Sequence, residues 1–150
     1  MAKKTAKDSS KYNHARKAGY ASLIVANTIM IWVVSNLLAW HVPFLTSDFN
    51  SVQWMLTLSY LAAIVGYLLL ILHDPKWFHG FVRLIMNTFG FLALLSLFFV
   101  FPFDFSMYSS FNWDRLAKIV LGASSLGTAI GIIIEFMQLI FRKDYRAAEE

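Results

Sequence analysis

A single acidic residue, Glu135, stands well inside a long apolar stretch, and its carboxyl group is the first candidate for chemistry in this chain. Glu135 lies seven residues before Arg142, which puts it about 10 Å inside the end of the stretch if the segment is helical. An ionised carboxylate in hydrocarbon is costly unless it is paired, protonated or hydrated. We therefore expect Glu135 to serve a proton or cation relay, a polar ligand site, or a hydrogen-bond network that fixes helix register.

Other polar side chains fall at a similar depth in neighbouring apolar stretches. Arg83 and Asn87 are four residues apart, so they share one face of a helix. The planar guanidinium of Arg83 matches a carboxylate, which makes Arg83 and Glu135 the expected ion pair. We predict one buried polar cluster in the half of the molecule that contains the termini, formed by Asn27, Arg83, Asn87, Glu135 and Gln138.

Small residues recur at a spacing of four in the last apolar stretch. Ala123, Gly127 and Gly131 fall along one slowly drifting helix face that leads to Glu135. Small residues at this spacing let a second helix backbone come close, which favours helix association in a membrane. Two interpretations stay open, a contact with another membrane protein or a second copy, and packing inside the chain's own bundle.

Catalytic and metal-binding patterns are missing from the sequence. The chain has no cysteine, which excludes disulfides, thiolate metal ligation and a catalytic thiol. His41 falls on the opposite side from His73 and His79, so a haem held by two histidines is not supported, and His73 with His79 is a weak metal pattern. We predict no catalytic residue, no metal site and no cofactor, although 25 aromatic residues (14 Phe, 6 Tyr, 5 Trp) keep haem, quinone or pigment contact as alternatives.

Four apolar stretches must position these side chains, and they run roughly over residues 20–40, 54–72, 81–101 and 116–141. Each has about the 20 residues that a helix needs to cross a bilayer. Prolines at 43, 75 and 102 are expected to end the first three helices. The sequence therefore predicts an all-α, multi-pass membrane four-helix bundle, with Phe44, Phe49 and Trp54 at the membrane surface.

The placement of the charges predicts how the bundle sits in the membrane. Of 13 Lys and Arg residues, 11 lie on the side of the termini and only Arg115 and Lys118 on the other. This asymmetry is typical of cytoplasmic loops, so we expect both termini in the cytoplasm and a plasma or inner membrane. The same placement argues against nucleic acid as a partner. The expected organisation is a basic cytoplasmic tail at 1–19 that is disordered or a frayed helix, one membrane domain at 20–146 and an acidic cytoplasmic end at 147–150.

Short loops and the missing catalytic set favour a small non-catalytic integral membrane subunit or scaffold. Besides the lipid bilayer, its expected partner is itself or another membrane protein, bound through the fourth stretch. An alternative is an oligomeric transport unit for ions, protons or small solutes that uses the Glu135 cluster. A third possibility is a subunit associated with a redox cofactor, a pigment or quinone.

Overall fold

The computed structural model consists of four α-helices: α1 (Ala2–Asn36), α2 (Phe49–Leu72), α3 (Lys76–Val100) and α4 (Trp113–Ala147). It describes residues 2–73, 76–108 and 111–147, with the side chains of 15–73, 78–108 and 111–140. All four helices contain a segment long and apolar enough to cross a membrane, and the described residues form no strand. The predicted all-α four-helix membrane fold is confirmed.

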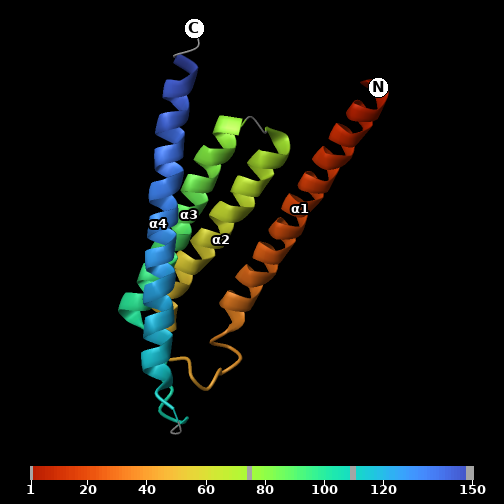
Figure 1. Cartoon of the computed structure of the whole chain (residues 1–150). Coiled ribbons are helices and arrows are strands. Elements are labelled where there is room, and N and C mark those ends of the chain that lie inside the picture. The colour runs from red at the N-terminus through yellow and green to blue at the C-terminus, as the bar shows by residue number, and fades with distance from the viewer. Residues whose placement is uncertain (1, 74–75, 109–110, 148–150) are drawn as a thin grey trace.

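The helices form a row in which sequence neighbours pack side by side. The backbone of α1 approaches α2, α2 approaches α3 and α3 approaches α4, and no other pair among the described helices comes this close. Both termini lie at the same end of the molecule as the connection between α2 and α3 (Figure 1). Toward that end α1 leans away from α2 (Figure 1). The bundle is therefore open between α1 and α4.

A buried apolar core lies at the opposite end, beside the α1–α2 loop. Val34 of α1 packs there with Phe49 and Val52 of α2, and all three are buried. Leu97 of α3 covers this group. Phe49 was expected at the membrane surface, and this prediction is wrong because α2 begins at Phe49 and turns its ring into the core.

The two loops at this end are joined to each other. Thr46 N–H donates to the Pro102 carbonyl at 3.0 Å, and Asp104 N–H donates to the Phe44 carbonyl at 2.9 Å. The rings of Phe44 and Phe105 stack with centroids 5.4 Å apart. Because these loops belong to different helix pairs, the contact ties α1–α2 to α3–α4.

The helix ends differ from the apolar stretches by several residues. The first helix ends at Asn36 rather than near Trp40, because His41 takes a left-handed φ of 49° and its N–H turns back to the Leu38 carbonyl. Phe101, with φ 44°, ends α3 in the same conformation just before Pro102. Conversely, α2 begins five residues earlier than hydropathy suggested, because polar residues occupy its first turns.

The basic tail is not separate from the first span. Residues 2–19, for which the sequence left disorder or a frayed helix open, continue α1 as helix. Helix α4 likewise extends beyond its apolar stretch to Ala147. The basic residues near both termini thus lie on helical extensions of the membrane spans.

Candidate functional site

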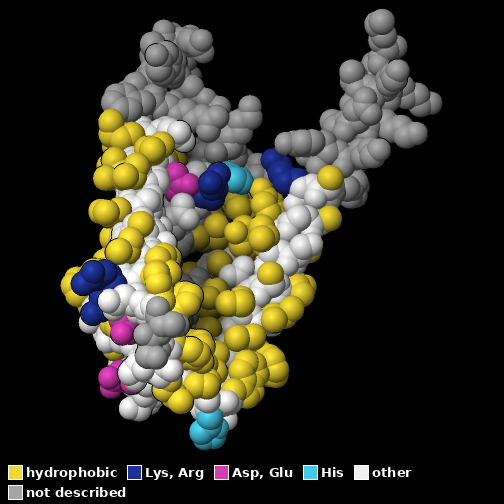
Figure 2. All heavy atoms as spheres, turned by 60° about the horizontal axis from the view of Figure 1, so that its bottom comes forward, with side chains coloured by type: hydrophobic (Ala, Val, Ile, Leu, Met, Phe, Trp, Pro, Cys, Tyr) yellow, Lys and Arg dark blue, Asp and Glu magenta, His cyan; other side chains and the backbone are white. Residues whose placement is uncertain are grey.

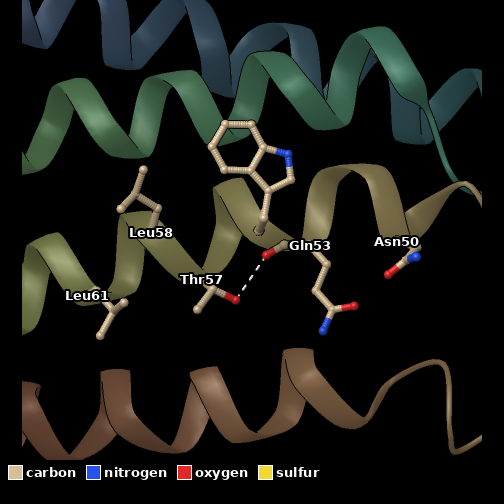
Figure 3. A pocket seen from close by; sticks show the side chains of 6 residues that line it. Asn50, Gln53, Thr57, Leu58 and Leu61 are labelled. Atoms are coloured by element: carbon tan, nitrogen blue, oxygen red, sulfur yellow. Dashed lines mark hydrogen bonds between the residues drawn. The ribbon is translucent and has the colours of Figure 1, made fainter.

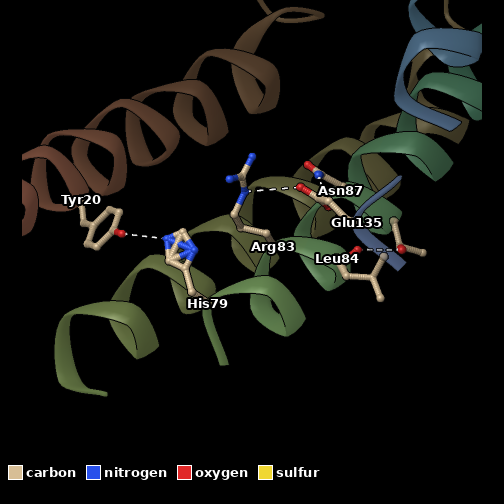
Figure 4. A network of polar contacts seen from close by, with 7 residues as sticks. Tyr20, His79, Arg83, Leu84, Asn87 and Glu135 are labelled. Carbon is tan, nitrogen blue, oxygen red and sulfur yellow. Dashed lines mark hydrogen bonds and ion pairs between the residues drawn. The ribbon is translucent and has the colours of Figure 1, made fainter. Parts of the chain in front are cut away.

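The Glu135 carboxylate of α4 meets two side chains of α3 (Figure 4). Asn87 Nδ2 donates to Glu135 Oε2 at 2.7 Å, and Arg83 Nε lies 3.4 Å from Glu135 Oε1. Both carboxylate oxygens therefore have a partner. The arrangement joins α3 to α4 through one ion pair and one charge-assisted hydrogen bond.

A periodic polar stripe on α3 builds this site. His79, Arg83 and Asn87 are each four residues apart, so the helix carries them on one face. One face of α4 packs on α3; on this face Ser125 is buried and Leu139 contacts Gly80. Glu135 lies at the side of this face and reaches the polar stripe from there. The packing of α4 on α3 thus fixes the depth at which the carboxylate meets its partners.

Two members of the predicted cluster lie outside this group. The Asn27 side chain donates to the Leu23 carbonyl of its own helix at 2.7 Å. Its helix, α1, does not approach α4, so similar depth did not bring Asn27 to Glu135. Gln138 is exposed on α4. The structure brings together Arg83, Asn87 and Glu135, whereas Asn27 bonds within α1 and Gln138 is exposed one turn beyond Glu135.

Tyr20 and His79 extend the polar group toward α1, and sequence reasoning missed both roles. The Tyr20 hydroxyl lies 2.9 Å from His79 Nε2 (Figure 4). The Tyr20 ring stacks on Tyr67 of α2 with centroids 5.9 Å apart. The spacing of four between His79 and Arg83 could have predicted that His79 lies on the polar face of α3. No sequence pattern predicts that Tyr20 of α1 contacts a residue of α3.

The histidines do not converge on a metal. His79 contacts Tyr20, His73 packs edge-on against Phe78, and His41 lies in the distant α1–α2 loop. Within the described part of the chain, no three His, Cys, Asp or Glu residues form a metal-binding group.

The small-residue face of α4 points away from α3. At about 100° per residue, Gly127 lies roughly 160° around the helix from the buried Ser125. A methyl group added at Gly127 or Gly131 would meet no atom within 4 Å, and Ala123 is exposed. Packing inside the chain's own bundle therefore does not account for this face among the described residues.

The close approach between helices occurs instead at Gly66 of α2, which the sequence did not single out. A methyl group added there would overlap Met86 Sδ and lie 3.1 Å from Val82 Cγ1. Gly66 is buried against these two side chains of α3. The described glycine with the least room for a side chain thus lies outside the repeated small-residue motif of α4.

Two surface grooves lie near the loop end. One, of about 420 Å³, is lined only by α2 (Asn50, Gln53, Trp54, Thr57, Leu58 and Leu61), and its Thr57 hydroxyl already donates to the Gln53 carbonyl at 3.0 Å (Figure 3). The other, of about 460 Å³, lies between α3 and α4 beside Arg115 and Lys118. Lys118 Nζ sits 4.6 Å from the centre of the Phe101 ring, so its charge rests on the loop of its own chain. Neither groove gathers a set of catalytic groups.

The loop beside the second groove contains Asp104. Among the described acidic residues outside the spans, it alone has a shifted pKa. Hydrogen bonds from the Ser106 backbone N–H, at 2.9 Å, and from the Ser106 side chain lower the pKa of Asp104 below its ordinary value. Asp104 is fully exposed, so this effect shapes the loop rather than a site.

Comparison with models of known protein families, with curated proteins and with solved structures yields no match. Function must therefore be argued from the geometry of this chain.

Proposed function

We propose that this protein is a small non-catalytic membrane subunit or scaffold that associates with a second copy or a larger membrane protein through α4. The observation that carries the proposal is the open small-residue face at Ala123, Gly127 and Gly131, against which no part of the described chain packs. A backbone that another helix can approach closely is the usual basis of helix association in lipid.

The shape of the molecule supports this role. Among the described helices, α4 packs on α3 alone, so most of its circumference faces outward, and Ile119, Leu126, Ile130 and Ile133 are all more than half exposed. These residues suit either lipid or a partner, whereas the exposed Gly127 offers lipid little contact area. The asymmetry of basic residues supports an orientation with both termini in the cytoplasm of a plasma or inner membrane.

Cross-linking in native membranes tests self-association directly, because the chain has no cysteine of its own. A single cysteine at Ala123→Cys is compared with one at Ile133→Cys, which is 61% exposed on a different face of the same helix. We expect oxidation to give a covalent dimer with A123C and not with I133C. Adding Gly127→Leu to A123C should abolish the dimer, because leucine keeps the two backbones apart.

Native mass spectrometry of the gently solubilised wild-type protein tests association with a different protein. A mixed assembly that G127L dissociates supports the subunit role without a cross-linked dimer. A monomer in native lipid, with equal cross-linking of A123C and I133C, would show the proposal to be wrong.

The contacts of Glu135 favour one second candidate, an oligomeric transport unit for protons or cations. An ion pair within a membrane span commonly marks a conduction path. The test is flux into liposomes, which Glu135→Gln should abolish while helix content and oligomeric state stay as in the wild type. Equal flux in the variant, or no flux in the wild type, would remove this candidate.

A further inference from the structure

Arg83 is a charged residue inside a membrane span, and much of its side chain is exposed. Such a side chain needs a polar partner besides Glu135. Arg83 lies five residues inside the span Phe78–Val100, and 55% of its side chain is exposed, against 16% for Glu135. A span of this length rises about 34 Å, slightly more than the hydrocarbon core, so Arg83 sits just below the headgroup level. A guanidinium at that depth is stable when it reaches polar headgroups.

The ion pair leaves the outer part of the guanidinium available. Glu135 meets Arg83 at Nε, and the two terminal nitrogens point away from Glu135 (Figure 4). Two parallel N–H groups at the end of an arginine are suited to bidentate binding of a phosphate.

The surroundings suit a lipid rather than a soluble anion. The molecule is hollowed between α1 and the other helices, with basic, acidic and histidine side chains at the far end and hydrophobic side chains in front of them (Figure 2). Since α1 and α4 do not approach each other, lipid chains can enter the hollow from the side. A polar group at headgroup depth above an apolar hollow matches the two parts of a phospholipid.

The charge balance also fits one phosphodiester. Glu135 offsets the charge of Arg83, and each of its oxygens has a partner on α3, so the pair together is neutral. Lys17 is exposed on α1 three residues before Tyr20, hence on the same face and about one turn nearer the terminus. This lysine adds a positive charge on the Tyr20 face of α1, on the side of the termini.

We infer that the terminal nitrogens of Arg83 bind the phosphate of a phospholipid from the leaflet on the side of the termini. The acyl chains of this lipid lie in the hollow between α1 and α4, and Tyr20 and His79 border its headgroup. The inference does not depend on the association of α4.

The test uses full-length protein, delipidated in a neutral detergent. Its unfolding midpoint and its retained adducts in native mass spectrometry are measured with phosphatidylglycerol, with diacylglycerol and with inorganic phosphate. We expect phosphatidylglycerol alone to raise the midpoint and to remain bound. Equal stabilisation by diacylglycerol would show that only the chains bind, and equal stabilisation by inorganic phosphate would show a site for a free anion; either result overturns the inference.

Variants locate the site. Arg83→Gln alone strands the Glu135 carboxylate and can unfold the protein, so the double variant Arg83→Gln with Glu135→Gln keeps the shape of both side chains without either charge. We expect phosphatidylglycerol to bind this double variant about 10- to 100-fold more weakly, the loss typical of a hydrogen bond to a charged group. The matched control is Arg115→Gln, an exposed arginine at the opposite end. Wild-type affinity in the double variant, or an equal loss in R115Q, would overturn the assignment.

Discussion

At the scale of single residues, the two predicted asparagines differ in what their side chains hold. Asn87 of α3 donates to Glu135 of α4 at 2.7 Å, whereas Asn27 donates at the same distance to a carbonyl of its own helix. Only the first bond is lost when α3 separates from α4. Asn27 therefore serves as a control for how much the hydrogen bond of Asn87 between α3 and α4 contributes to stability.

We predict that Asn87→Ala lowers the free energy of unfolding by about 1 kcal/mol, the usual size of a hydrogen bond between membrane helices or to a charged group. Asn27→Ala should change the free energy of unfolding by only about 0.3 kcal/mol, because the helix keeps its own backbone hydrogen bonds. Unfolding in mixed micelles of mild detergent and dodecyl sulfate measures both. An equal loss in the two variants would mean that the Asn87–Glu135 bond adds no stability.

His41 closes the turn that follows α1 in a strained backbone conformation. Its φ of 49° lies in the left-handed region, where a side chain with a Cβ is strained and glycine is not. His41→Gly should raise the free energy of unfolding by about 0.5 to 1 kcal/mol, since relief of strain exceeds the added freedom of the unfolded chain. His41→Ala keeps the strain and serves as the control. The same micelle titration reports both, and a gain in H41A equal to that in H41G would point to loss of the imidazole instead.

At the scale of helices, hydropathy predicted the four spans because about 20 consecutive apolar residues leave few alternatives. It placed the end of α1 four residues too late and the start of α2 five too late, because backbone conformation at His41 and polar first turns are invisible to a hydropathy average. Depth predicted the Arg83–Glu135 contact, yet depth alone could not say which helices are neighbours. Asn27 was misplaced for that reason.

Glycines on two helices should respond differently to the same substitution. Gly66→Leu forces a side chain into Met86 and Val82, and we expect it to cost about 1–3 kcal/mol through overpacking between α2 and α3. Gly127→Leu meets nothing within the chain, so the folded monomer should keep its stability while its association is lost. Detergent unfolding and size-exclusion chromatography separate these effects. If G127L unfolds the monomer as G66L does, the α4 face packs within the chain.

At the scale of the whole molecule, the paired loops and the splayed termini divide the row into a closed end and an open end. Backbone bonds between the loops and the core around Phe49 hold all four helices together at one end. At the other, Tyr20 of α1 contacts Tyr67 and His79. The loop contacts of Thr46 with Pro102 and of Phe44 with Asp104 join residues nearly sixty positions apart, and no periodic pattern in the sequence indicates them.

The orientation of this row in the membrane follows from charge and can be measured with the same cysteine-free background. We predict that Ser47→Cys, exposed in the loop at the closed end, reacts with a membrane-impermeant maleimide added to intact cells. His73→Cys, exposed at the end of α2 on the side of the termini, should react only after permeabilisation. The expected difference arises because 11 of 13 basic residues lie on the side of His73, and such residues are retained in the cytoplasm. The reverse labelling pattern would place both termini outside, and the phospholipid bound at Arg83 would then come from the outer leaflet.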